Sequence, residues 1–471
     1  MTTPTTEAVG RASKAPGVAQ IDGFRGRLIG AGSHDYDAAR AVWNGAIDRR
    51  PRLIARCLGA ADVVAAVRFA RERGLEIAVR GGGHNVAGTA VCDDGIVIDL
   101  SAMRAVRVDP AERRAWVQGG ALWGDVDHET QAHGLATTGG IVSHTGVAGL
   151  TLGGGIGWLM RKHGLTVDNL LAADVVTAEG KLLRASEAEH PDLFWALRGG
   201  GGNFGAVTSF EFRLHGVGPT VLAGPILWDA TDAREVLRFY RDFVRDAPDE
   251  LGTVVRFGAV PPLPGIPGDL HWRPGVMVGT CYAGPIADGE RALRRLRACR
   301  TPLLDLVRPA PYVGFQSAID STVVHGWNYY WKSTHLPELR DDLIDVIVRH
   351  AFACSSPRSY VAMFHLQGAV GRVAAGGTAF GNRQASHAIT LDSVWRPGED
   401  FGDRDTAWTK AFFAALGRFR AGVYVNFLGG DEDPDRVREA YGDSVYDRLA
   451  DVKSKYDPDN VFHHNQNIRP A

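Results

Sequence analysis

The sequence has little net charge and no long apolar segment. Its 52 Lys and Arg residues are nearly balanced by 54 Asp and Glu residues, so the formal net charge is −2 over 471 residues. No overall positive field would hold a polyanion, which argues against nucleic acid and anionic membrane as partners. The chain also lacks a run of about 18 apolar residues that could span a bilayer, and its N-terminus lacks the apolar core of a signal peptide.

Cysteine is scarce and dispersed. The five cysteines form no C-x-x-C pair and lie at Cys57, Cys92, Cys281, Cys299 and Cys354. An odd, scattered set is typical of a reducing compartment rather than of a disulfide framework. With an ordinary 45% of hydrophobic residues, this favours a globular protein of the cytoplasm. We expect no metal centre.

The length exceeds that of a single hydrophobic core, which rarely grows past about 250–300 residues, so at least two domains are expected. Residues 1–20 are rich in Thr, Ala, Gly and Pro and are predicted to be a flexible tail. Short strands interleaved with helices up to residue 217 indicate α+β architecture. Beyond that point, alternating runs such as 360–366 and 388–395 predict an antiparallel sheet.

Glycine, with 58 residues, is in excess, and it is clustered. A predicted strand at 75–79 runs into Arg-Gly-Gly-Gly-His-Asn at 80–85, and further clusters follow at 153–157 and 199–205. Consecutive glycines after a strand expose backbone N–H groups without Cβ atoms, which suits a phosphate. The first cluster precedes another strand rather than a helix, so a Rossmann domain is disfavoured and a dinucleotide in another fold is favoured.

Together these motifs resemble a known family. Residues 78–85, 139–169 and 197–205 resemble the FAD-binding domain of the vanillyl-alcohol-oxidase/p-cresol-methylhydroxylase (PCMH) superfamily. Residues 424–427, 453–462 and 465–468 are similar to the C-terminal element of its berberine-bridge-enzyme branch. The resemblance implies an α+β fold with a two-part PCMH-type FAD-binding domain at 47–217. The resemblance further implies a substrate domain at 218–420, in which helices back an antiparallel sheet. It also implies a C-terminal segment at 421–471 that returns to the FAD domain.

The resemblance also implies the chemistry. Such enzymes pass a hydride from a small organic substrate to flavin N5 and reoxidise the flavin with O₂. Two alternatives stay open: a flavin dehydrogenase with another electron acceptor, and a nucleotide-binding protein that has lost catalysis. The composition resembles that of bacterial members, several of which act in natural-product biosynthesis, but the sequence specifies neither the substrate nor the oligomeric state.

His84 is expected to carry the flavin. In the family, the equivalent histidine is bonded to the flavin 8α carbon, and a neutral imidazole is a suitable nucleophile. The alternative is an ordinary loop histidine. Many relatives have a second link through a cysteine eleven residues before the central glycine triplet, where this sequence has Val142. Because valine forms no thioether, we expect a single link.

The Tyr-x-Asn sequence at 424–426 resembles the family's active-site strand, and this resemblance makes Tyr424 the best candidate for a catalytic base or a substrate-orienting phenol. If residues 424–426 form a strand, Tyr424 and Asn426 face the same side. A phenol has an ordinary pKa of about 10, so a base there would need nearby stabilisation of its charge. A packed tyrosine with a satisfied hydroxyl is the alternative. The resemblance places Thr145 where the family's chain passes the flavin ring, near C4a and N5, although a turn hydroxyl explains Thr145 equally well. His144 is interpreted as structural.

The remaining candidates bind the cofactor or brace its loops. Asn467 is expected to contact the flavin ring, and Asp168 and Asn169 to brace the nucleotide loops. The aromatic cluster at 329–331 lines the pocket or fills a sheet core. The other expected FAD-binding residues are Arg80, Gly81, Gly82, Gly83, Asn85, Gly146, Gly149, Gly153, Gly154, Gly155, Gly157, Asn203 and Val207.

Overall fold

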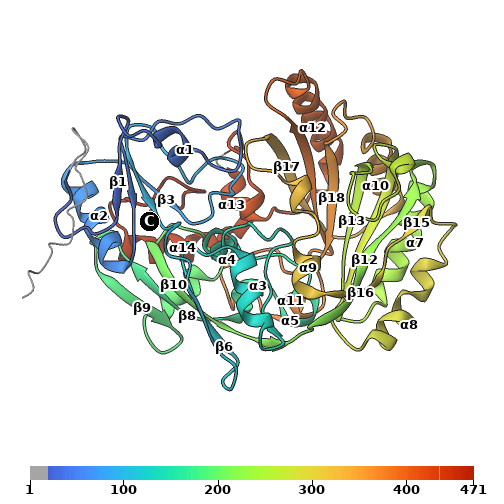
Figure 1. The fold of residues 1–471 in the computed structure, drawn as a ribbon, viewed down its shortest axis with the longest axis horizontal. Helices are drawn as coiled ribbons and strands as arrows, with labels where there is room; N and C mark the ends of the chain where they lie inside the picture. The colour runs from blue at the N-terminus through green and yellow to red at the C-terminus, as the bar shows by residue number, and fades with distance from the viewer. Residues whose placement is uncertain (1–19, 434) are drawn as a thin grey trace, which may run out of the picture.

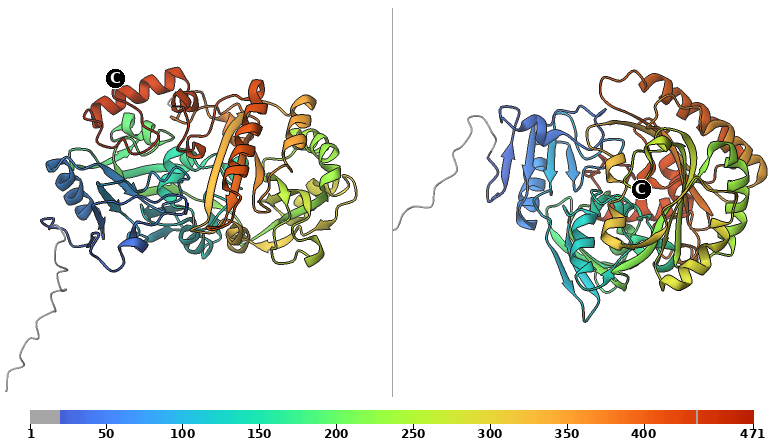
Figure 2. Two further views of the ribbon diagram at one scale, coloured as in Figure 1. Left: turned by 90° about the horizontal axis from the view of Figure 1, so that it is seen from above. Right: turned by 45° about the vertical axis from the view of Figure 1, so that its right-hand side comes forward.

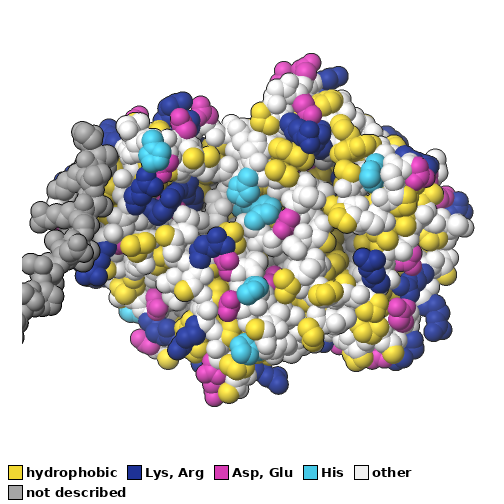
Figure 3. All heavy atoms as spheres, viewed as in Figure 1, with side chains coloured by type: hydrophobic (Ala, Val, Ile, Leu, Met, Phe, Trp, Pro, Cys, Tyr) yellow, Lys and Arg dark blue, Asp and Glu magenta, His cyan; other side chains and the backbone are white. Residues whose placement is uncertain are grey.

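The structure, a computed structural model, describes residues 20–433 and 435–471. The flexible tail predicted for residues 1–20 lies, apart from Gln20, outside the described residues. Figure 1 shows two lobes side by side, with the N-terminal half and the C-terminal tail in one and the middle of the chain in the other. On the face drawn in Figure 3, acidic and basic side chains are interspersed, in keeping with the balanced charge.

The first lobe begins with a small sheet of order β1-β2-β4-β3, in which β2 and β3 pair with β4 in parallel. Helix α2 covers it because Val63, Ala66, Val67 and Ala70 recur at helical spacing and are all buried. The strands are β1 (Arg27–Ile29), β2 (Leu53–Arg56), β3 (Ile77–Arg80) and β4 (Ile96–Asp99), and the helices are α1 (Tyr36–Arg40) and α2 (Ala60–Glu72). Since β1 belongs to this sheet, the lobe begins before residue 47.

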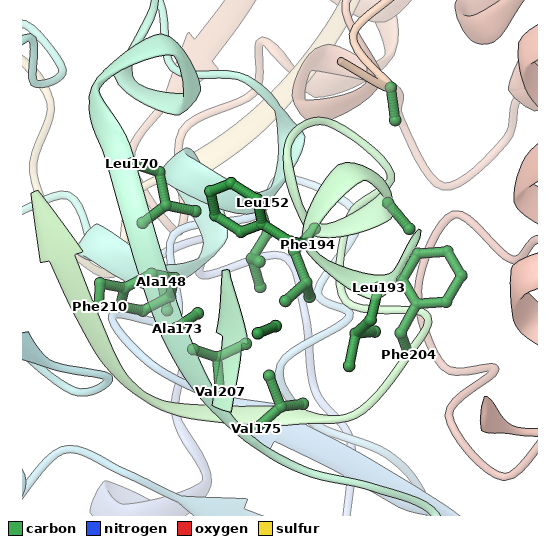
Figure 4. Packing of buried hydrophobic residues seen from close by; sticks show 14 of the residues in the cluster. Ala148, Leu152, Leu170, Ala173, Val175, Leu193, Phe194, Phe204, Val207 and Phe210 are labelled. Atoms are coloured by element: carbon green, nitrogen blue, oxygen red, sulfur yellow. The ribbon is translucent and has the colours of Figure 1, made fainter. Parts of the chain in front are cut away.

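A second, antiparallel sheet of order β5-β6-β10-β8-β9 completes the first lobe. Figure 4 shows Phe194, Phe204 and Phe210 among the buried side chains that pack between this sheet and its helices. The strands are β5 (Val106–Asp109), β6 (Arg114–Gln118), β8 (Leu170–Val176), β9 (Leu182–Ser186) and β10 (Ala206–Arg213); the helices are α3 (Trp123–Gln131), α4 (Val147–Gly153), α5 (Met160–His163) and α6 (Pro191–Leu197).

The second lobe is built on one large antiparallel sheet of order β15-β12-β14-β13-β18-β19-β17, with β16 beside β12. The strands are β12 (Thr220–Asp229), β13 (Leu251–Ala259), β14 (Pro274–Tyr282), β15 (Leu304–Asp305), β16 (Arg308–Pro311), β17 (Asn328–Leu336), β18 (Tyr360–His365) and β19 (His387–Trp395). Helices α7 (Ala233–Arg245), α8 (Ile286–Arg297), α10 (Asp341–His350) and α12 (Gly402–Leu416) pack on one face of this sheet in a shared buried cluster. The right-hand view of Figure 2 shows helices along the outer side of this lobe.

Alternation along the strands assigns the two faces of this sheet. Val255 and Phe257 of β13 pack under the helices with Leu391 of β19. Their sequence neighbours therefore face the first lobe. The predicted α+β architecture, with an antiparallel sheet backed by helices, is confirmed.

The chain ends by returning to the first lobe through α13 (Asp435–Tyr441) and α14 (Asp443–Tyr456). The fully buried Lys453 donates hydrogen bonds to the carbonyl oxygens of Asn203 (2.7 Å) and Phe462 (3.0 Å) and pairs with Asp457. These contacts fix the tail against the glycine cluster at 199–205. Within the described residues, no helix is long and apolar enough to cross a membrane.

Candidate functional site

One cavity of about 400 Å³ lies between the lobes and is lined by both of them. Its walls come from the first glycine loop, the segment before and within α4, the glycine cluster at 201–205, the inner face of the large sheet and the C-terminal tail. Residues far apart in the sequence therefore share one site. Among the predicted site residues, the cavity is lined by Gly81, Gly82, Gly83, His84, Asn85, Thr145, Gly146, Gly149, Asn203, Val207, Tyr424 and Asn426.

The first glycine loop follows β3 directly and presents backbone to the cavity. Gly83 has φ +66°, and a Cβ on Gly82 would lie 2.5 Å from the backbone of Gly146, so neither position accepts a side chain without strain. Arg80, another expected FAD-binding residue, does not line the cavity. Its guanidinium donates to Asp99 (2.8 Å) and to the Ala39 carbonyl (2.6 Å), so it supports the loop from behind.

His84 stands at the end of this loop with its ring held on two sides. The ring stacks on Trp43, with centroids 4.3 Å apart and planes at 14°. Its Nε2 lies 3.2 Å from Nδ1 of His144. Burial, with His144 and His325 nearby, lowers the pKa of His84 well below its ordinary value. The imidazole is therefore neutral at physiological pH and available as a nucleophile.

Val142 lines the same cavity as His84, and no cysteine does so within the described part of the chain. Cys92, the cysteine nearest to His84 in the sequence, is buried elsewhere. Its thiol faces the Ile96 carbonyl at 3.7 Å, and burial raises its pKa to about 12. A reactive thiolate is thus not available there.

The glycines at 153–157 do not line the cavity, so the structure offers no support for a second phosphate-binding loop there. A Cβ on Gly153 would meet the Asn426 side chain at 2.2 Å, and one on Gly157 would meet the Gly139 carbonyl at 1.6 Å. Gly154 and Gly155 lie against Phe380 and Thr166 in the same way. These residues are glycines because neighbouring protein atoms leave no room for side chains.

Asn203 ties the third glycine cluster to the C-terminal tail. Its Nδ2 donates to the carbonyls of Gly200 (2.9 Å) and Gln466 (3.2 Å), and its Oδ1 accepts from the Ile468 N–H (3.0 Å). Ile468 is fully buried, which fixes the register of the tail. In that register Asn465 and Gln466 line the cavity and Asn467 does not.

Tyr424 and Asn426 do not lie in a strand. Tyr424 precedes the 3₁₀ turn η6 (Val425–Phe427), which its carbonyl closes by accepting from the Phe427 N–H (2.9 Å). Both side chains nevertheless line the cavity. The Tyr424 hydroxyl accepts hydrogen bonds from the Gly155 N–H (2.9 Å) and from Asn426 Nδ2 (2.7 Å). Burial raises the pKa of Tyr424 to about 12, although both donors act in the opposite direction.

The inner face of the large sheet contributes polar residues that the sequence analysis missed. Arg256, Thr390 and Asp392 line the cavity among mostly apolar and aromatic neighbours. Asp392 is 3% exposed. Burial raises its pKa to about 7, although a hydrogen bond with Thr390 and the charge of Arg256 act in the opposite direction. The sequence did contain a signal for Asp392. It is a charged residue in a strand of alternating pattern, and it lies on the face of the strand opposite the apolar residues that form the core.

Of the aromatic cluster at 329–331, only Trp331 lines the cavity. Tyr329 stacks against Trp43, with centroids 3.7 Å apart. The Tyr330 hydroxyl donates to Asp431 instead. Asp168 accepts a bidentate ion pair from Arg383, and Asn169 bonds to the carbonyls of His163 and Leu165, so both brace loops away from the cavity.

Comparison with known proteins identifies two family models in the chain. The model described as "FAD binding domain" matches residues 51–186, and "Berberine and berberine like" matches residues 423–469. The (R)-6-hydroxynicotine oxidase of Paenarthrobacter nicotinovorans is 33% identical, covering 95% of this chain and 97% of the relative.

Solved structures of such enzymes match over the whole fold. The crystal structure of 6-hydroxy-D-nicotine oxidase from Arthrobacter nicotinovorans has a TM-score of 0.84 and 31% identity, covering 95% of this chain and 98% of the other. The xylooligosaccharide oxidase of Myceliophthora thermophila in complex with xylobiose has a TM-score of 0.82 and 26% identity, covering 95% and 97%.

Proposed function

Since this chain belongs to the berberine-bridge-like family of FAD-dependent oxidases, we propose that its cavity holds FAD bonded covalently to His84 and oxidises a small organic substrate with O₂. The main observation in support of this proposal is that one cavity joins the glycine loop and His84 to the inner face of the large sheet. When bound, FAD supplies the hydride acceptor and transfers the electrons to O₂. The side chains described below bind and orient the substrate.

The cavity fits FAD at its glycine-lined end. Gly81, Gly82 and Gly83 present backbone without Cβ atoms where the pyrophosphate would lie, and a Cβ at Gly82 would clash with Gly146. We propose a single histidyl link because His84 is neutral, Val142 occupies the place of the second link and no cysteine lines the described cavity wall.

The two titratable groups at the substrate end differ in what they can do. Tyr424, with a pKa of about 12, keeps its proton at neutral pH. Its oxygen already accepts two hydrogen bonds, so its own O–H is free to donate to a substrate atom. Asp392, with a pKa of about 7, is better matched to accept a proton near neutral pH. We therefore assign substrate orientation to Tyr424, held by Asn426, and proton acceptance to Asp392.

The cavity wall favours a compact substrate with an apolar body. Trp158, Trp331, Phe364, Phe427 and Met277 line it, and charged groups on the sheet face are confined to Arg256 and Asp392. An oligosaccharide needs hydrogen-bond partners along its whole length, whereas an aromatic amine needs few. We propose a small amine, of the kind named for the hydroxynicotine oxidase, and take a sugar, as named for the xylooligosaccharide oxidase, as the second candidate.

A spectrum of the purified protein before and after acid precipitation tests the cofactor and its covalency together. We expect a flavin spectrum that stays with the precipitate. Colourless protein would favour a nucleotide-binding protein without catalysis. Hydrogen peroxide release with 6-hydroxynicotine, and none with xylobiose, supports the amine assignment; substrate-dependent flavin reduction without peroxide would indicate a dehydrogenase.

A further inference from the structure

The residue beside His84 is a second imidazole from a distant part of the chain. His144 lies between β7 (Leu135–Ala136) and α4 and does not line the cavity itself. Its Nδ1 is 3.2 Å from Nε2 of His84, within the range of a hydrogen bond that passes a proton between two nitrogens. The sequence alone favoured a structural role for His144, because nothing in it places the two rings together.

The ring of His84 is held so that this contact persists. Trp43 stacks on one face, and its backbone N–H donates to the Gly83 carbonyl (3.1 Å), which ties the stacking residue to the loop that carries His84. Rotation of the His84 ring would break the stack. The edge of the ring bearing Nε2 is therefore directed at His144 while the rest of the ring stays at the cavity wall.

The surroundings of His144 suit a group that accepts a proton and then carries a positive charge. Burial lowers its pKa, so the free ring is neutral and Nδ1 can accept a proton. The Asp320 carboxylate acts in the opposite direction and would stabilise an imidazolium once formed. Asp320 is itself fixed by hydrogen bonds from the backbone N–H (3.0 Å) and hydroxyl of Ser143. His84, His144 and Asp320 thus supply a nucleophile, a base beside it and a carboxylate whose charge favours the protonated form of that base.

We propose that His144 is the general base for covalent attachment of the flavin to His84, an inference that rests on the covalent link proposed above. In the tautomer with the proton on Nε2, His84 donates that proton to His144 Nδ1 as its own Nδ1 bonds to the flavin 8α carbon. His144 then releases the proton to solvent.

The electrons and atoms balance with O₂ as oxidant. One C–N bond forms, and one C–H bond of the 8α carbon and one N–H bond of His84 break. The two electrons pass to the flavin, which takes up two protons in exchange with solvent. O₂, the electron acceptor of this oxidase, then restores the oxidised flavin and leaves as H₂O₂.

Three variants of the full chain separate the possible roles of His144. His144→Ala removes both the contact and the base. His144→Asn retains a hydrogen-bonding group near the Nδ1 position but cannot hold the proton. His325→Gln is the matched control, because its ring lies in the same cluster, 6.2 Å from that of His84, without a hydrogen bond to it. Protein from riboflavin-starved cells would be incubated with FAD and sampled over time for flavin fluorescence in denaturing gels.

We expect both His144 variants to attach flavin about 10²–10⁴-fold more slowly than wild type, the scale of a lost general base, while His325→Gln reacts at the wild-type rate. Added imidazole should accelerate His144→Ala. Wild-type rates in both His144 variants overturn the inference. A wild-type rate in His144→Asn alone reduces His144 to a positioning residue and overturns the base role. If the proposed covalent link itself does not exist, the result is distinguishable, because wild-type protein would then release all of its flavin on denaturation.

Discussion

Arg256 and Asp392 lie on the same cavity wall, on strands that flank β18, and neither forms an ion pair among the described residues. Arg256 pairs opposite Ala362 of β18, and Asp392 pairs opposite Tyr360, two residues along the same strand. The Arg256 guanidinium lies over the Tyr360 ring, 4.8 Å from its centroid, and donates to the Ala259 carbonyl (2.8 Å). A buried charge without a partner is costly. A substrate that donates to Asp392 and accepts from Arg256 would relieve that cost.

Replacement of Asp392 by Asn tests this substrate end of the site. Asp392 accepts a proton only when ionised, so kcat/KM of the wild type should rise as the pH increases through about 7 and then level off. Asp392→Asn should lower kcat/KM by about 10²–10⁴ and lose the rise near pH 7. Initial rates of peroxide formation between pH 5 and 9 provide the measurement. A variant that keeps the wild-type pH profile would show that another group titrates.

Replacement of His84 by Ala tests the flavin link. The variant should still bind FAD, because the glycine loop is intact, but it should release the flavin on acid precipitation. An 8α bond withdraws electron density from the flavin, so flavin reduction should also be slower in the variant. Peptide mapping of the wild type is the control: flavin should be found on the peptide with His84 and on none of the five cysteines. Flavin on a cysteine would contradict the single link.

Replacement of Gly157 by Ala separates packing from cofactor binding. A Cβ there would lie 1.6 Å from the Gly139 carbonyl, so the backbone must shift, and we expect a loss of more than about 2 kcal/mol of unfolding free energy. Gly314→Ala is the matched control, since a Cβ in α9 (Tyr312–Gln316) meets nothing within 4 Å. Urea unfolding of both variants gives the comparison. Unchanged stability with weakened FAD binding would instead support a phosphate-binding role for residues 153–157.

Local patterns predicted what depends on local structure. The helical spacing of apolar residues predicted α2, and a strand followed by glycines predicted the loop that lines the cavity. The alternation of apolar and polar residues predicted the sheet of the second lobe. The family and the oxidase function, inferred from glycine motifs and the tail, are confirmed by the relatives.

Long-range contacts were not predictable in this way. Glycines required by a phosphate and glycines required by close packing look the same in a sequence, so the sequence did not reveal that residues 153–157 pack closely against other protein atoms. A three-residue segment at 424–426 is too short for its period to distinguish a strand from a 3₁₀ turn. Asp392 was missed because strand register decides which face of the sheet lines the cavity, and the His84–His144 pair joins residues 60 positions apart.

Replacement of Tyr424 by Phe tests the orienting role. Tyr424 is 3% exposed and its ring packs against Phe427, with centroids 4.8 Å apart, so the variant keeps this packing. It loses the acceptor for the Gly155 N–H and Asn426 Nδ2 and the hydroxyl proton offered to the cavity. A merely structural tyrosine predicts a loss of about 1–3 kcal/mol of unfolding free energy for the unsatisfied donors, with flavin reduction near the wild-type rate. An orienting donor predicts in addition that flavin reduction slows by about 10²-fold, because a misplaced substrate loses the near-attack geometry.

The pH dependence of flavin reduction distinguishes Tyr424 from Asp392. Since the pKa of Tyr424 is about 12, Tyr424→Phe should keep the wild-type pH dependence near neutrality, whereas Asp392→Asn should lose it. Anaerobic stopped-flow measurements of flavin reduction at several pH values, alongside urea unfolding, separate these outcomes. If the variant instead abolishes a titration near pH 7, Tyr424 is the base and the roles assigned to these two residues are reversed.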